Sequence, residues 1–138
     1  MRVFLDTNVL VSAFAARGIC AELLEVVLLE HELIVGAHVL REFDKALRQK
    51  VKLPASRVEE IVRFIAGEAL VTVKSSRPFE GSVDPDDALV IGDALEGQSE
   101  VLVTGDAALL RLRAADQLAI VSPRQFWERL QSGPQRPR

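Results

Sequence analysis

Short, largely apolar runs recur along the chain and predict buried strands. They lie at residues 3–5 (VFL), 32–35 (ELIV), 70–73 (LVTV), 100–104 (EVLVT) and 118–121 (LAIV). The runs are continuous rather than alternating, which is typical of strands covered on both faces, as in parallel sheets. We therefore predict a central parallel sheet of about five strands.

Between these runs, apolar residues recur with helical spacing. The stripes fall within residues 23–28, 39–47, 58–65 and 88–95. Ser56 and Glu59, at the start of the third stripe, have the spacing of a capping box, which predicts where that helix begins. Strands that alternate with helices imply right-handed crossovers, and we predict a three-layer α/β/α domain.

Length and composition indicate one ordinary globular domain. The chain has 138 residues, of which 49% are hydrophobic and 27% charged, enough to bury a core without disulfides or a structural metal. We assign residues 1–131 to this domain and residues 132–138, which are polar and contain two prolines, to a disordered tail. Cys20 is the only cysteine, and no apolar run reaches the length of a membrane span, so we expect a cytoplasmic protein.

Acidic residues gather where the predicted strands end. The set comprises Asp6, Glu42, Asp106 and, where a long loop enters a helix, Asp84, Asp86 and Asp87. A lone Asp in such a place is more often a helix cap than a catalyst. However, the carboxyl ends of parallel strands meet at one edge of a sheet, and four crossovers each deliver a carboxylate there. We therefore expect these acids to converge.

A cluster of carboxylates favours a bound cation. Two ionised carboxylates about 5 Å apart repel by roughly 3 kcal/mol at an effective dielectric near 20, so the cluster protonates or destabilises the fold unless a cation sits in it. All-oxygen ligands, with no Cys or His at ligand spacing, favour Mg²⁺ or Mn²⁺ over Zn²⁺. Such ions, held in pairs by carboxylates, are a common device for hydrolysing phosphodiester bonds.

Four blocks of the sequence resemble the signature blocks of PIN-domain ribonucleases. They are residues 4–13 (FLDTNVLVSA), 40–43 (LREF), 84–95 (DPDDALVIGDAL) and 101–110 (VLVTGDAALL). They follow the family's order across nearly the whole chain and are most similar to the branch of toxin–antitoxin toxins related to VapC. The resemblance implies a PIN-like fold and Mg²⁺- or Mn²⁺-dependent cleavage of an RNA substrate. It also implies a cognate antitoxin partner and a homodimer.

The resemblance also implies roles for individual residues. The catalytic and metal-binding acids are Asp6, Glu42, Asp87 and Asp106, and the polar residues that orient them are Thr7, Asn8 and Thr104. Asp84 and Asp86 lie outside the strict motif as loop or capping acids, and Asp93 faces either the site or solvent. Members of this branch commonly carry another acid where this chain has Ala108. One or two ions are therefore expected, the second binding weakly or only with substrate.

The basic stretch at residues 41–63 is the candidate RNA-binding rim. From it we select Arg48, Lys50, Lys52 and Arg57, although such charges are more often a solvated helix face. His38 begins the helix that carries Glu42 and either contacts RNA or has no chemical role, the latter being more common. Phe126 and Trp127 either stack a base or, more commonly, pack a final amphipathic helix over the sheet.

Two other classes of protein also place acidic residues at the ends of parallel strands. A PIN-like module that binds RNA or a protein without cleaving it is one, and Ala108 leaves room for it. A phosphoacceptor signalling domain also places aspartates at strand ends, but it requires a Lys after the last strand, where this chain has Ser122 and Pro123. The net charge of −3 does not exclude a local basic face for nucleic acid.

Overall fold

The computed structural model describes residues 1–132, which form seven helices and six strands of a single sheet. In chain order the elements are β1 (Arg2–Leu5), α1 (Thr7–Ala15), α2 (Ile19–Glu30), β2 (Glu32–Gly36), α3 (Ala37–Gln49), α4 (Ala55–Glu68), β3 (Val71–Val73), α5 (Pro85–Glu96), β4 (Val101–Val103), α6 (Ala107–Leu112), β5 (Ala114–Ala115), β6 (Leu118–Val121) and α7 (Pro123–Gln131).

The sheet has the strand order β3-β2-β1-β4-β6-β5. The five longer strands are all parallel, as predicted, and they coincide with the five apolar runs to within one or two residues. The sixth, β5, is a two-residue strand that pairs antiparallel with β6 at the edge. The chain starts at the central strand β1 and builds outwards in both directions, so the order of strands reverses between β1 and β4. In parallel sheets, ligand sites lie at such a reversal.

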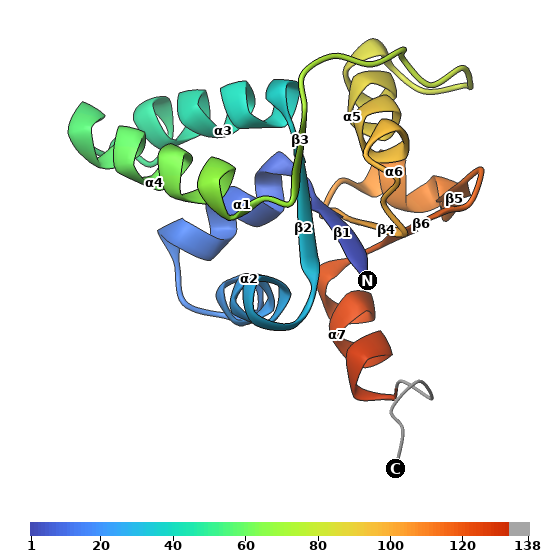
Figure 1. The fold of residues 1–138 in the computed structure, drawn as a ribbon, viewed down its shortest axis with the longest axis horizontal. Coiled ribbons are helices and arrows are strands. Elements are labelled where there is room, and N and C mark those ends of the chain that lie inside the picture. Colours follow the sequence, from blue (N-terminus) through green and yellow to red (C-terminus); the bar gives the residue numbers. More distant parts are fainter. Residues whose placement is uncertain (133–138) are drawn as a thin grey trace.

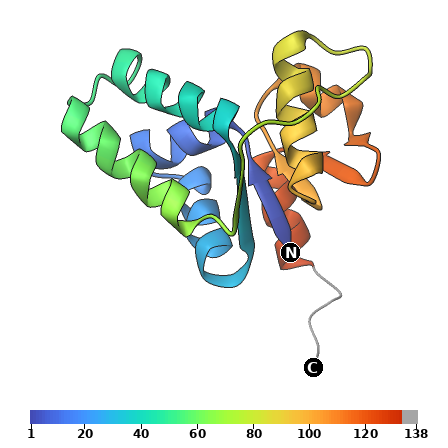
Figure 2. The same ribbon diagram turned by 45° about the horizontal axis from the view of Figure 1, so that its top comes forward.

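The helices cover the sheet in two layers. Helices α1, α2, α3 and α4 lie on one side of the strands, and α5 and α6 lie on the other (Figure 1). The turned view shows the same separation (Figure 2). Helix α7 contacts α2 and β6. This is the predicted three-layer α/β/α arrangement.

The core lies on both faces of the sheet. Phe4, Ile34 and Leu102, from three adjacent strands, have no exposed surface, which is why these strands read as continuous apolar runs rather than alternating ones. Phe126 of α7 is also fully buried in this core. The prediction that the last helix packs over the sheet is therefore confirmed.

One helix boundary differs from its prediction. Helix α4 begins at Ala55, and its N-cap residue is Pro54, which makes no side-chain capping bond. The predicted capping box of Ser56 and Glu59 is therefore wrong, because Ser56 already lies inside the first turn. The Pro54 carbonyl accepts the first helical hydrogen bond, from the Val58 N–H at 3.0 Å. Proline in an extended conformation can precede a helix because its missing N–H is not needed there.

The last described helix ends at Gln131, and Ser132 follows as its C-cap. The rest of the predicted tail, residues 133–138, lies outside the described residues. Within residues 1–132, every helix is too short or too polar to cross a membrane.

Candidate active site

Asp6 links the end of β1 to the start of α1. It is the N-cap residue of α1, with extended backbone angles, and its Oδ1 accepts the Thr7 N–H at 2.8 Å. Its other oxygen, Oδ2, accepts the Thr104 hydroxyl at 2.7 Å and the Asn8 side-chain amide at 3.2 Å. Asp6 is only 6% exposed. The carboxylate is therefore both a cap and a group held in a fixed orientation by its neighbours.

Asn8 and Thr104 join this position to the end of β4. Asn8 Oδ1 accepts the Gly105 N–H at 2.7 Å, and the Thr104 hydroxyl oxygen accepts the Asp106 N–H at 3.0 Å. A side chain at Gly105 would press against Asn8 Oδ1, so the close approach favours glycine. These bonds fix the backbone from which Asp106 projects.

Asp106 occupies the equivalent place on the next strand. It is the N-cap residue of α6, and its Oδ1 accepts the Ala108 N–H at 2.8 Å. Ala108, where the family commonly has another acid, thus supports Asp106 through its backbone. Like Asp6, Asp106 follows a parallel strand and precedes a helix, and β1 and β4 are hydrogen-bonded neighbours.

The start of α5 supplies a third group of acids. Asp84 is the N-cap residue, and its Oδ1 accepts the Asp87 N–H at 2.9 Å, so the capping role expected of Asp84 is observed. Burial of Asp87, together with the charges of Asp106, Asp84, Asp6 and Asp86, raises its pKa to about 6. The charges of Asp6 and Asp106, which follow β1 and β4, therefore both act on the Asp87 carboxyl group.

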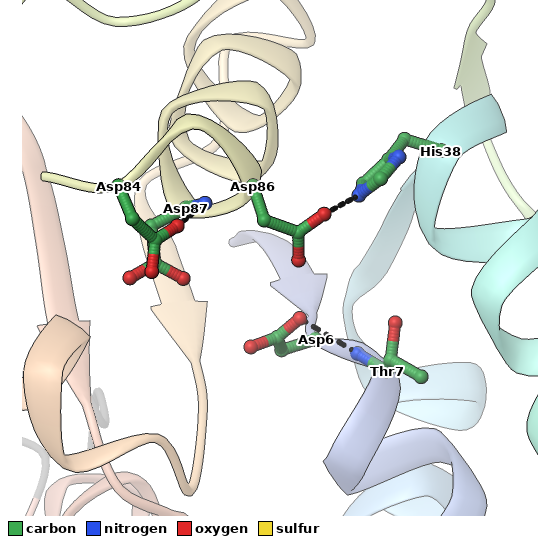
Figure 3. Close-up of polar contacts among 6 residues, drawn as sticks. All are labelled: Asp6, Thr7, His38, Asp84, Asp86 and Asp87. Carbon is green, nitrogen blue, oxygen red and sulfur yellow. Dashed lines mark hydrogen bonds and ion pairs between the residues drawn. The ribbon is translucent and has the colours of Figure 1, made fainter.

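Asp86 does not cap α5 but contacts His38 of α3, with 2.8 Å between Asp86 Oδ1 and His38 Nε2. Figure 3 shows this contact across a space that Asp6 and Asp87 also face. The Asp86 side chain is 68% exposed, whereas His38 is mostly covered. Both residues were noted in the sequence, but their contact was not predicted. It depends on how closely α3 and α5 approach each other, and local sequence patterns carry no information on this distance.

One pocket of about 360 Å³ unites these groups. All four predicted acids line it, and the other lining residues come from α1, α3 and α5 and from Lys50, the C-cap of α3. The full lining is Asp6, Thr7, Asn8, Val11, Ser12, His38, Glu42, Ala46, Lys50, Asp86, Asp87, Val90 and Asp106. Glu42 reaches it from the second turn of α3. Lys50 was predicted for the RNA-binding rim and lies in the pocket lining, whereas Ser12 was not predicted at the site.

The pocket has the electrostatics of a cation site. Burial raises the pKa of Asp6, the nearby Asp106 charge raises it further, and the hydrogen bonds from Thr104, Thr7 and Asn8 oppose this. Carboxylate oxygens that repel one another suit a hard divalent cation. Within residues 1–132, however, no three of the Asp, Glu, His or Cys side chains are already grouped closely enough to hold an ion. The pocket fits such a cation by its charge and donor chemistry.

Asp93 lies elsewhere. It is 4% exposed and accepts the Ser76 hydroxyl at 2.6 Å, and it is not among the residues that line the pocket. Burial raises its pKa, and the Ser76 hydrogen bond, His38 and Arg41 lower it. Asp93 therefore faces neither the pocket nor solvent: it ties the loop before α5 to that helix.

The comparisons with known proteins agree with this geometry. A family model described as a PIN domain matches residues 2–108. The chain belongs to the PIN-domain family. PIN domains are generally nucleases, which places the protein among hydrolases, and they typically use divalent metals.

A solved structure shows the same fold. The crystal structure of VapBC2 from Rickettsia felis, bound to a DNA fragment from its promoter, includes a chain similar to this one, with a TM-score of 0.62 and 13% sequence identity. The match covers 88% of this chain and 98% of that chain. No curated protein matches the sequence. The family and the fold predicted from the four sequence blocks are thus confirmed.

Proposed function

We propose that this PIN-domain protein is a metal-dependent endoribonuclease that hydrolyses phosphodiester bonds of RNA in the acidic pocket. One observation carries the proposal: Asp6, Glu42, Asp87 and Asp106 come from four different parts of the chain and line one pocket. Bringing like charges together lowers the free energy of unfolding. In a nuclease of this family, the same carboxylates would hold the metal ions used in hydrolysis.

Asp6, Glu42, Asp87 and Asp106 would hold Mg²⁺ or Mn²⁺, in one or two ions. When bound, divalent ions activate the attacking water and stabilise the leaving 3′ oxygen. Asp6 supplies an oriented carboxylate because Thr104 and Asn8 donate hydrogen bonds to its Oδ2. Thr7 contributes its N–H to Oδ1. Such orienting partners commonly affect metal affinity or activity by about 10–100-fold.

The predicted basic rim receives partial support. Lys50 lines the acidic pocket itself, where its ammonium group suits a substrate phosphate. Arg48 is paired with Asp44 at 2.6 Å, and Arg57 with Glu60 at 3.2 Å, so both have carboxylate partners that RNA would have to displace. Lys50 and Lys52 are therefore the stronger candidates of the four.

A toxin role in a toxin–antitoxin system rests on the similarity to the VapBC2 structure. We extend this to a cognate antitoxin that blocks the pocket and to a homodimer. The alternative is a module that binds RNA or protein without cleavage. It is favoured by Ala108 and by the absence of a preformed ligand group within residues 1–132.

The deciding experiment compares RNA cleavage by the wild type, Asp6→Asn and Asp116→Asn, with Mg²⁺, Mn²⁺ or EDTA. Asp116 is an exposed residue in a turn with φ of 53°, a conformation that Asn also tolerates, so it controls for loss of one carboxylate. We expect Asp6→Asn to lower the rate by about 100-fold or more and Asp116→Asn to leave it unchanged.

EDTA should abolish cleavage by the wild type. Cleavage that survives EDTA or the Asp6→Asn substitution would contradict the metal–carboxylate mechanism. Metal binding by the wild type without cleavage of any RNA would favour the binding module instead.

A further inference from the structure

A second groove, of about 940 Å³, lies between α6, β6 and α7. It opens where β6 extends past its two-residue partner β5, so that Ile120 and Val121 form part of its wall. Three arginines line it, Arg111 and Arg113 from the end of α6 and Arg129 from α7. The groove shares no lining residue with the acidic pocket.

The groove concentrates positive charge that the protein does not neutralise. Glu128 is the one acidic residue among the lining side chains, against three arginines. Within residues 1–132, no carboxylate forms an ion pair with Arg111, Arg113 or Arg129, whereas Arg48 and Arg57 of the predicted rim are both paired. All three arginines are exposed. In a chain of net charge −3, such a group is suited to an anionic ligand.

The backbone of Arg113 is fixed beside the groove. Its φ is 65°, a left-handed conformation that is uncommon for residues other than glycine. The Arg113 N–H donates to the Leu110 carbonyl at 3.2 Å, and its carbonyl accepts the Ile120 N–H at 2.9 Å. These bonds tie the end of α6 to β6, so Arg113 occupies a fixed place on the wall.

The groove and the acidic pocket adjoin along the chain. Asp106 lines the acidic pocket, and the next residue, Ala107, lines the groove. Ser122 and Gln125, at the start of α7, line the groove directly after the carboxyl end of β6. Strand β6 pairs with β4, which leads to Asp106. The groove and the acidic pocket are therefore lined by consecutive residues at the β4–α6 junction, and a ligand in the groove lies beside the segment that carries Asp106.

We infer that the groove formed by Arg111, Arg113 and Arg129 binds the phosphate backbone of the RNA strand whose cleavage the acidic pocket is proposed to perform. The inference rests on the proposed function, because the adjoining pocket identifies the ligand as a nucleic acid rather than an acidic protein segment. Guanidinium groups bind phosphate oxygens in a bidentate manner. Contacts away from the reacting bond position a substrate without taking part in the chemistry.

The test measures RNA binding without cleavage. A labelled single-stranded RNA is titrated in EDTA, followed by fluorescence anisotropy at several salt concentrations, and its integrity is checked on a gel. The test variant combines Arg111→Gln, Arg113→Gly and Arg129→Gln. Glycine at position 113 suits the positive φ, so this change removes the guanidinium without straining the fold.

The control variant combines Arg17→Gln, Lys74→Gln and Arg77→Gln, which removes the same charge from exposed residues outside both cavities and outside the basic stretch at residues 41–63. Each phosphate contact contributes about 0.7 to the slope of log affinity against log salt for single strands. We expect the test variant to lose at least about tenfold in affinity and about two units of slope, and the control to stay close to the wild type.

Equal affinity and slope for the test variant and the control would overturn the inference and leave an acidic protein segment as the occupant. A wild type that binds no RNA would also overturn it. Because the assay needs no cleavage, RNA binding through the groove in a protein that cuts no RNA would contradict the proposed nuclease function and leave the groove assignment standing.

Discussion

The orientation of the Asp6 side chain depends most on the hydroxyl group of Thr104. It is fully buried, donates to Asp6 Oδ2 and accepts the Asp106 N–H. One hydroxyl thus connects two of the four acids. Since Asp6 already uses Oδ1 to cap α1, only Oδ2 is oriented by side chains.

Replacing Thr104 by Val keeps the shape and removes these hydrogen bonds. We expect a loss of about 1–3 kcal/mol in the free energy of unfolding, because a buried carboxylate loses a donor, and a fall of about 10–100-fold in RNA cleavage. Chemical denaturation and initial rates measure the two effects. Thr104→Ser should restore most activity, and Thr72→Val, at an exposed strand position, should change neither quantity appreciably.

Asp87 makes the stability of the metal-free protein depend on pH. Its pKa in the folded protein is about 6, against an ordinary value of 3.8. The folded state therefore binds more protons than the unfolded state between these values, and stability falls as the pH rises through this window. Above about pH 6 the full cost of the buried, repelled charge is present.

Asp87→Asn should consequently stabilise the protein at pH 8 in EDTA and have little effect at pH 4. A gain of 1 kcal/mol corresponds to about 4 °C in Tm for a domain of this size. Thermal unfolding at the two pH values provides the measurement, with Asp116→Asn as the control. An equal gain at both pH values would contradict the assigned cause.

At the level of single residues, the convergence of the four acids could be predicted from the sequence because each stands at a strand end or within the first turns of a helix. Their role in metal binding and catalysis stays a prediction. Contacts between helices were not predictable in this way. The pairing of His38 with Asp86, and the burial of Asp93 against Ser76, depend on the distance between α3, α5 and the loop before it. Neither distance has a signature in local spacing.

At the level of secondary structure, long elements were predictable and short ones were not. The five parallel strands were found because each is a continuous apolar run. Helix α6 has six residues and β5 has two, too few to display a period. Helix α6 forms one wall of the arginine groove and β5 leaves the end of β6 uncovered beside it, so this groove had no recognisable pattern in the sequence.

The junction of β2 and α3 requires a glycine. A Cβ atom built on Gly36 would collide with the buried carboxylate of Asp93. We expect Gly36→Ala to destabilise the protein by about 1–3 kcal/mol, since packed interiors resist added atoms. Gly67, near the end of α4, has open space around its Cβ position, and Gly67→Ala should instead stabilise by about 0.5–1 kcal/mol. Urea denaturation of both variants measures the contrast, and equal effects would contradict it.

At the level of the whole molecule, the two signs of charge are divided between two adjoining cavities, one acidic and one rich in arginine. The acidic pocket is costly to the protein alone, so a cation that enters it should stabilise the fold. We expect saturating Mg²⁺ or Mn²⁺ to raise the Tm at pH 7.5 by up to about 10 °C, from binding energy of about 2–3 kcal/mol.

This metal effect should shrink at pH 5, where protons compete for Asp87, and in Asp6→Asn, but not in Asp116→Asn. Differential scanning fluorimetry over a metal titration measures all four conditions. An equal rise in Asp6→Asn would show that the ions bind elsewhere on the protein.

The two edge strands of the sheet affect how copies of this chain can associate. The edge strands are β3, with three residues, and β5, with two. A strand from another molecule would gain few backbone hydrogen bonds at either edge, and short edges of this kind protect natural sheets against runaway polymerisation. We therefore expect a dimer of this protein to form through its helices. We also expect the short edge strands β3 and β5 to resist growth of fibres during folding.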